Sequence, residues 1–577
     1  MFSFSLVLRL VYTTRRFRQA SAPPKRVISA DPLTRWSERL QYGWQQRCIL
    51  SQMYVGMEGC TSAFNAMNSI RTCMHFGIAA PPSFLALTRM EDIQGLHSRD
   101  NTQQQQHPEE YVNNTPVIVS PTMREVAQFG ATFFLHDSFL QQLPLVALEN
   151  FTPRAESIHV CRIPAAARLV IGHENNGVSK KFLEDGTEDN NRDFVAKKVV
   201  YVPQYGTISS LNVVTSMGIA LFYTVLDSHY PTSRSLAVNT EECNNRALSS
   251  SQWDALCAYQ RCFQQQIPMK GGTDSILSRV DERPIHPLYY QKDIKSIMEL
   301  HHNLRKLLLR MCSFERVSSE ASLRFGLSVL YENMMDQRSL GGIVRSANAF
   351  LVDHVYYFGR KKINVVGTIG TQHYTPPVFL GASFEENDES TEVWGDELQT
   401  RLEELNGAPT TWWFLDCGHT FLYTEPVGCE ETVKEEVKED ENKTKNNSCS
   451  KNLTMTTMMM KRMMLQQKER GFAESLAWLH THQRDANFTL SLCDTEDHIR
   501  AAIDNASSMT RTTVVLLIPQ EGILPPFSLL RRCSKIVSVL PISEANDDTG
   551  AGLPVSVTAG IALQRLSAVM HPEVASL

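Results

Sequence analysis

The stretch 166–226 constrains the fold most, because it alternates short apolar runs with turns and longer helical segments. The apolar runs 169–171 and 199–202 are rich in β-branched residues and end at turn residues. Such runs are typical of buried strands in an α/β sheet. The turns that follow, 172–177 and 204–210, are therefore expected side by side at the carboxyl ends of their strands. Open α/β sheets bind ligands at that edge.

The two turns carry the strings GHENNGVS and VPQYGTISSLNV. They resemble motifs two and three of the SpoU/TrmH branch of the SPOUT methyltransferases, which are ribose 2′-O-methyltransferases of tRNA and rRNA. The family pattern is Gly-x-Glu-x-x-Gly, then Ile-Pro-x-x-Gly-x-x-x-Ser-Leu-Asn-Val, and the only departure is Val in place of Ile. The matching residues are Gly172, Glu174, Gly177, Val202, Pro203, Gly206, Ser210, Leu211, Asn212 and Val213.

A third motif of the same family is expected upstream, in the run TSAFNAMNSIRTCMHFG. Asn65 and Arg71 have the spacing of motif one, in which Asn precedes a helix and Arg lies on it, and Gly77 closes the helical pattern. Taken alone, Asn65 would be an ordinary N-cap and Arg71 a solvated helical charge. Their position upstream of the other two motifs favours the functional interpretation.

The resemblance implies both a fold and a methyl donor. Members of this family hold S-adenosylmethionine in a deep C-terminal knot, where the chain threads through a loop, and such threading is exceptional among proteins. Glycines let the backbone approach a ligand closely and permit positive φ, so main-chain groups would bind the adenine between apolar side chains. The cofactor-binding residues that the resemblance implies are Gly172, Gly177, Val202, Pro203, Gly206, Leu211 and Asn212.

The resemblance also implies how the reaction runs. Methyl transfer to a ribose hydroxyl is an in-line displacement on an already activated sulfonium, so positioning supplies much of the rate. The family gives the motif-one arginine, here Arg71, a base-like role, although a guanidinium with a pKa above about 12 is a poor base. Arg71 would either deprotonate the hydroxyl with help from an RNA phosphate or stabilise the forming alkoxide. The residues implied to orient Arg71, the ribose and the methionine end are Asn65, Glu174, Ser210 and Asn212.

A second copy of the unit is predicted over 321–570. A strand-turn-helix-strand pattern matches motif one, with Arg345 in the arginine position and Ser339 where Asn is expected. The other two motifs are damaged, because Pro519 removes a backbone donor from the Gly-rich turn and Gly552–Leu553–Pro554 replaces Ser-Leu-Asn. This copy is therefore expected to bind no cofactor.

The chain is predicted to belong to the α/β class, as two tandem α/β-knot domains that pair as an intramolecular pseudodimer. The first copy, 40–228, would be catalytic, and the second would complete the RNA surface. The other expected segments are a linker with helices at 229–320 and disordered insertions at 97–114 and 426–470.

The start of the chain has the composition of a targeting segment. Residues 1–28 contain Arg and Ser, and no acidic residue occurs before Asp31, as in a mitochondrial transit peptide. A secretory signal or a basic arm are the alternatives, but Arg9 interrupts the apolar run that a signal would need. No run reaches the length of a transmembrane helix, so a location in the mitochondrial matrix is expected.

The 13 cysteines form neither a disulfide framework nor a zinc pattern, which suits a reducing compartment. The proposed chemistry needs no metal, and His173 is interpreted as a turn residue.

The predicted function is S-adenosylmethionine-dependent methylation of a ribose 2′-OH in rRNA or tRNA, with mitochondrial rRNA favoured and the large ribosomal subunit precursor as a possible partner. The net charge of −6 is unlike that of a non-specific nucleic-acid binder, so RNA contact would use local patches and shape. The alternative is a methyltransferase-like factor that holds rRNA during ribosome assembly without methylating it. The sequence specifies neither the target nucleotide nor any assembly beyond the pseudodimer.

Overall fold

The computed structural model describes the secondary-structure core of both predicted copies. The described residues are 49–60, 62–78, 82–85, 134–135, 137–149, 155–159, 161–173, 177–183, 195–204, 210–234, 326–333, 339–350, 352–363, 367–381, 388–418, 472–506, 513–521, 523–541 and 552–570. The predicted transit peptide 1–28, the insertions 97–114 and 426–470, and the helices expected in the linker after residue 234 lie outside these ranges.

The first domain is built on a six-stranded sheet in which every pair of neighbouring strands is parallel. Its strand order is β2-β1-β5-β3-β6-β4. The strands are β1 (Met53–Glu58), β2 (Ser83–Leu85), β3 (Leu145–Leu148), β4 (Ala155–Ser157), β5 (Ala167–Ile171) and β6 (Lys198–Tyr201). The apolar runs at 169–171 and 199–202 thus form strands, as predicted. They are not neighbours, because β3 lies between them.

The second domain is built on a seven-stranded parallel sheet with the order β11-β13-β10-β12-β7-β8-β9. Without the short edge strand β9, the order read from the other edge is β8-β7-β12-β10-β13-β11. This matches the first sheet when the strands of each domain are counted along the chain. The strands are β7 (Gly326–Asn333), β8 (His354–Gly359), β9 (Val378–Phe379), β10 (Thr410–Asp416), β11 (Thr489–Ser491), β12 (Thr513–Ile518) and β13 (Cys533–Ser538). The prediction of two α/β units is confirmed at this level of detail.

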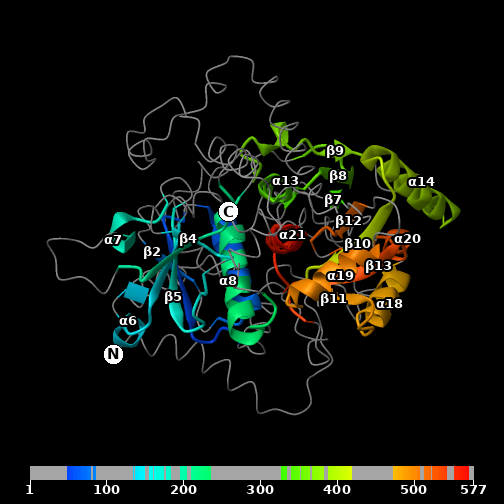
Figure 1. The fold of residues 1–577 in the computed structure, drawn as a ribbon. Helices are drawn as coiled ribbons and strands as arrows, with labels where there is room; N and C mark the ends of the chain where they lie inside the picture. Colours follow the sequence, from blue (N-terminus) through cyan, green and yellow to red (C-terminus); the bar gives the residue numbers. More distant parts are fainter. Residues whose placement is uncertain are drawn as a thin grey trace, which may run out of the picture.

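The helices alternate with the strands, and the second domain has two, α18 and α19, with no counterpart among the described residues of the first. In the first domain they are α3 (Ala63–His75), α6 (Ser138–Gln141), α7 (Lys180–Leu183) and α8 (Val213–His229). In the second they are α13 (Ser339–Ala349), the 3-10 helix η7 (Thr371–His373), α14 (Asp388–Asn406), α18 (Phe472–His482), α19 (Glu496–Ala506), α20 (Phe527–Leu530) and α21 (Val555–Met570). Figure 1 shows α8 and α21, the last helices of the two units, between the two sheets.

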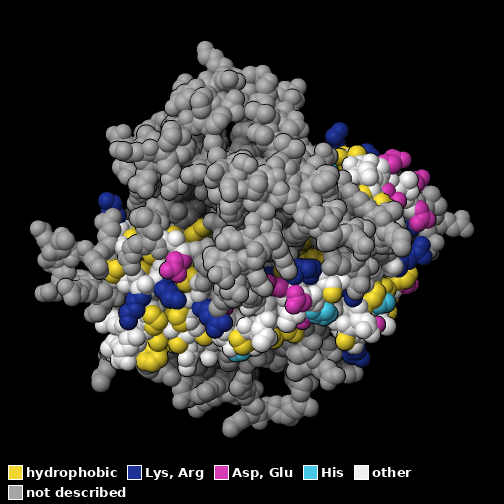
Figure 2. Space-filling view, viewed as in Figure 1, with side chains coloured by type: hydrophobic (Ala, Val, Ile, Leu, Met, Phe, Trp, Pro, Cys, Tyr) yellow, Lys and Arg dark blue, Asp and Glu magenta, His cyan; other side chains and the backbone are white. Residues whose placement is uncertain are grey.

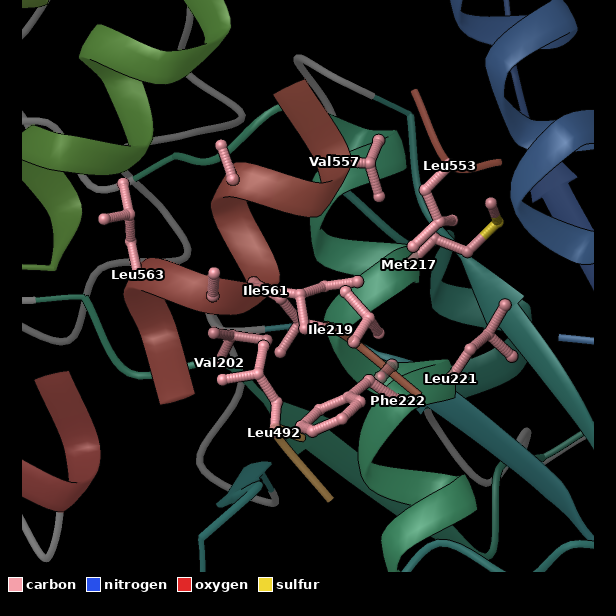
Figure 3. Packing of buried hydrophobic residues seen from close by; sticks show 14 of the residues in the cluster. Val202, Met217, Ile219, Leu221, Phe222, Leu492, Leu553, Val557, Ile561 and Leu563 are labelled. Carbon is pink, nitrogen blue, oxygen red and sulfur yellow. The ribbon is translucent and has the colours of Figure 1, made fainter. Parts of the chain in front are cut away.

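The two domains share one hydrophobic core, because α8 and α21 pack directly on each other. Ile219 of α8 and Ile561 of α21 are both fully buried, and their side chains lie together between the helices (Figure 3). Glycine makes the close approach possible on both sides. A Cβ added at Gly218 would come within 2.5 Å of Val557, and one at Gly560 within 2.2 Å of Thr215.

A polar network joins the same two helices. His159 accepts at Nε2 from the Gln564 amide at 3.2 Å, and its Nδ1 lies 3.3 Å from the Tyr223 hydroxyl, which fits a neutral imidazole. Arg234, paired with Asp227, and Arg565, bonded to Glu496, lie nearby. Burial and the two guanidiniums lower the pKa of His159 to about 3.

Two regions of the described surface differ in charge. Figure 2 shows acidic side chains gathered over α14, and the exposed ones on this helix include Asp396, Glu397 and Glu404. On the first domain, Arg162, Lys197 and Lys198 are exposed together, and the Lys198 ammonium donates to the Arg162 carbonyl at 3.1 Å. None of the helices within the described ranges has both the length and the apolar character needed to cross a bilayer.

We expect Gly560→Ala to lower the unfolding temperature, because the new methyl group would collide with Thr215 across the helix crossing. Overpacking of this kind costs about 1–3 kcal/mol. Differential scanning calorimetry would measure it, with Ala477→Val on the exposed side of α18 as the control. Thr215→Ala in the same chain should restore much of the loss. An unchanged unfolding temperature would show that the helices do not approach closely here.

We expect the protein to lose stability as the pH falls below about 6.5, because His159 is neutral when folded and binds a proton when unfolded. The unfolded chain binds more protons between the ordinary pKa of 6.5 and the folded value of about 3, so stability rises with pH across this window. At pH 4.5 the loss should be about 2–3 kcal/mol. Urea unfolding at pH 7 and 4.5 measures it, and His159→Gln should remove this part of the pH dependence.

Candidate functional site

The Gly-rich turn 172–177 follows β5, and β5 lies between β1 and β3. His173 and Gly177 close the turn by exchanging two backbone hydrogen bonds of 3.0 and 2.9 Å. Gly177 has φ of +66°, and a Cβ at Gly172 would lie 2.1 Å from the Gly177 carbonyl carbon. Both positions therefore require glycine, Gly177 because of its positive φ and Gly172 because the backbone approaches it closely. Glu174 lies outside the described residues.

Two carboxylates that the sequence analysis did not single out lie at this turn. Glu58 ends β1 and Glu149 follows β3, so they lie on either side of β5. Both are buried, at 6% exposure each. Glu149 Oε2 accepts from the Val178 amide at 2.6 Å, and Glu58 accepts from the Ser179 amide at 2.7 Å and its hydroxyl at 2.8 Å. An acidic residue directly after a buried strand was the sequence feature that could have indicated them.

The second turn follows β6 and leads into α8. Val202 and Leu211 are buried in the hydrophobic core, and Pro203 lies between β6 and the turn. Gly206 lies outside the described residues. Because β3 separates β5 from β6, the strand ends from which the two turns leave are not adjacent but two strand spacings apart, about 10 Å, on the same edge of the sheet. Glu149 lies between them, and its own amide donates to the Val200 carbonyl at 3.0 Å.

Asn65 and Asn212 meet, although 147 positions separate them. Asn212 caps α8, with its Oδ1 accepting from the Val214 amide at 2.9 Å, while its Nδ2 donates to Asn65 Oδ1 at 3.1 Å. Asn65 is not itself an N-cap, because Ser62 caps α3 and Asn65 lies inside the helix. The amide pair therefore fixes motif one against motif three in the first domain.

The motif-one arginines cross between the domains. Arg71, on α3 of the first domain, is buried and forms an ion pair with Glu521 of the second domain. Arg345, on α13 of the second domain, reaches the first. Its Nε donates to the Ser210 carbonyl at 2.5 Å, and its Nη2 donates to the Ser210 hydroxyl at 3.0 Å and the Leu211 carbonyl at 2.9 Å. The arginine seen at motif three of the first copy is thus Arg345, not the expected Arg71.

The corresponding edge of the second domain has different contacts. Its turn after β12 begins with Pro519, which has no amide hydrogen, and Leu553 donates to the Cys417 carbonyl at 3.0 Å in front of α21. Asp416, which ends β10, accepts from the Gly418 amide and the Gln483 side chain, both at 2.8 Å.

Metal-ligating side chains do not cluster in the parts of the chain that the structure describes. No group of three or more His, Cys, Asp or Glu side chains is placed there to hold a metal ion. The cysteines within those parts are free and buried: Cys60, Cys73, Cys161, Cys417, Cys493 and Cys533.

Comparison with known proteins gives no relative, since no family model, no curated protein and no solved structure matches the chain. The functional argument therefore depends on the sequence motifs and on the geometry of this edge.

Proposed function

We propose that this protein is an S-adenosylmethionine-dependent RNA methyltransferase that modifies a ribose 2′-OH, with one donor site in the first domain and one essential arginine from the second. Each domain would be an α/β knot, and the pair would form an intramolecular pseudodimer. The observation that carries the proposal is the contact of Arg345 with Ser210 and Leu211, because it joins an arginine to the best-preserved motif of the chain.

The residues at the edge of the first sheet suit the proposed donor. A ligand with an adenine and a methionine end needs close backbone approach, apolar contact and polar main-chain partners. Gly172 and Gly177 supply a tight turn, Val202 and Leu211 are buried apolar side chains beside the second turn, and Asn212 fixes the start of α8. Both turns leave the same edge of the sheet, where one ligand would contact residues of both.

The bound donor supplies an activated methyl group on a sulfonium. In the proposed step the ribose oxygen forms a bond to the methyl carbon as the sulfur–carbon bond breaks, and the hydroxyl proton leaves to water or an RNA phosphate. Arg345 donates three hydrogen bonds, so its guanidinium is protonated. We therefore assign it an electrostatic role, stabilising the forming alkoxide rather than accepting a proton. The Asn65–Asn212 pair would keep the two motifs in register.

The proposed substrate is rRNA, with tRNA as the other possibility, and the proposed location is the mitochondrial matrix. The acidic surface of α14 repels a phosphate backbone, whereas the exposed Arg162, Lys197 and Lys198 attract one. RNA would therefore approach the first domain. Mapping ribose methylation across mitochondrial RNAs with and without the protein would identify the target.

We expect Arg345→Ala to lower the maximal rate of methyl transfer by about 10²–10³-fold, as loss of an alkoxide-stabilising donor does in other enzymes. The dissociation constant for S-adenosylmethionine should change less than about threefold, a difference too small to represent a lost hydrogen bond. Transfer to RNA is followed with a labelled methyl group, and donor affinity by calorimetry. Lost donor binding in this variant would assign Arg345 a structural role instead.

Arg71 provides the matched control. Arg71→Ala removes one partner of the ion pair with Glu521, so its effect should appear mainly in the unfolding temperature. Glu521→Ala in the same chain should recover part of the stability. A loss of transfer in the stable double variant would return the catalytic role to Arg71.

We expect calorimetry to give one S-adenosylmethionine bound per chain, because the second copy lacks the Gly-rich turn and the Ser-Leu-Asn triplet. Asn212→Pro, which introduces the second copy's residue, should abolish that binding, since it removes the side chain that caps α8. Two sites per chain would contradict the asymmetry. No saturable binding would instead favour the assembly factor that holds rRNA without methylating it.

A further inference from the structure

We propose that Glu58 and Glu149 are positioning residues that hold the segment 172–179 in its donor-binding conformation. This proposal rests on the proposed function of the first domain. They form what we call the carboxylate clamp. Neither residue belongs to the motifs, and both come from strands other than the one that carries the turn.

The clamp follows from the strand order. Because β1 and β3 flank β5, the residues at their carboxyl ends lie on either side of the turn that leaves β5. Glu149 accepts from the Val178 amide on one side, and Glu58 accepts from the Ser179 amide and hydroxyl on the other. Val178 and Ser179, which directly follow the turn, are thus hydrogen-bonded to residues at the ends of two different strands.

The bonds are of a strong type. Hydrogen bonds from a backbone amide to a carboxylate are shorter and roughly twice as strong as those between neutral groups. The distances of 2.6 Å to Glu149 and 2.7 Å to Glu58 lie at the short end for such bonds, and the exposure of each acid is only 6%. Removing an acceptor would leave a buried amide without its partner, which is costly.

The clamp sets the geometry of both glycines. A Cβ at Gly177 would lie 2.1 Å from Glu149 Oε2, and a Cβ at Gly172 would lie 2.2 Å from the Val178 nitrogen. A side chain at 177 would therefore meet the carboxylate, and one at 172 would meet the backbone that the carboxylate holds. The bond from Val178 to Glu149 fixes the backbone against which Gly172 packs, in the tight form proposed for donor binding.

The second domain offers an internal comparison. Glu332 and Asp416 are buried at the carboxyl ends of β7 and β10, the strands that flank β12. Asp416 instead accepts from Gly418 and Gln483, and the turn after β12 begins with Pro519. Both domains thus contain an acidic pair at the corresponding strand ends, and the clamp is proposed for the first domain, where each acid accepts from the segment after the Gly-rich turn.

The test uses the full chain and measures two quantities for each variant. Hydrogen exchange of the peptide that covers 172–179, without ligand, reports the conformation of the turn. Calorimetry with S-adenosylmethionine reports donor affinity. The variants are Glu149→Leu, Glu149→Gln and Glu58→Leu, and the matched control is Asp416→Asn in the second domain.

We expect Glu149→Leu to speed exchange in 172–179 and to weaken donor affinity about 10-fold or more, since a buried amide loses a charged partner. Glu149→Gln should lie between it and the wild type, because the amide oxygen still accepts a hydrogen bond. The maximal transfer rate at saturating donor should change less than the affinity. Asp416→Asn should leave exchange in 172–179 and donor affinity unchanged.

Three results would overturn the clamp: unchanged exchange in both Leu variants, reduced affinity with unchanged exchange, or an equal effect of Asp416→Asn. If the wild type binds no donor, the proposed function fails, and the exchange measurement alone decides whether the carboxylates hold the turn. If a Leu variant does not fold, Glu149→Gln carries the comparison, and its exchange must exceed that of the wild type.

Discussion

The structure depends on the direct contact between α8 and α21. Glycines at 218 and 560 let the helices approach until Val557 and Thr215 fill the space that side chains there would occupy. The contact is reciprocal, with the same position of each helix receiving a residue from the other, as in a two-fold interface. It gives the two sheets a common core and brings α3 and α13 close enough for their arginines to reach the opposite domain.

The crossed arginines show how two copies of one unit come to have different roles. Arg345 meets a serine and main-chain carbonyls at an intact motif, whereas Arg71 meets the carboxylate of Glu521 at a damaged one. The ion pair of Arg71 with Glu521 joins the two domains, and the hydrogen bonds of Arg345 place it at the motif for which we propose an alkoxide-stabilising role. The departure of the second copy from the motif thus goes together with a different set of contacts for the arginine of the first copy.

Much of the fold could be predicted from the sequence, because strands, glycine turns and helix caps are local features. Strands β5 and β6 could be predicted from the apolar runs 169–171 and 199–202, and the end of α3 from Gly77. The position of β3 between β5 and β6 could not be predicted, since apolar runs carry no information on strand order. The same holds for Glu149 and for the partner of Arg71. Their contacts join residues far apart in the chain, and only the assembled sheets and the helix crossing bring these residues together.

The joining of both halves in one polypeptide has a consequence for how the protein behaves when it is scarce. Two separate subunits would part on dilution, and each would lose the arginine that the other provides. Here the tether fixes the local concentration of each half around the other at a value that no dilution changes. The contacts between the two halves are therefore complete in every folded molecule, even at very low protein concentration.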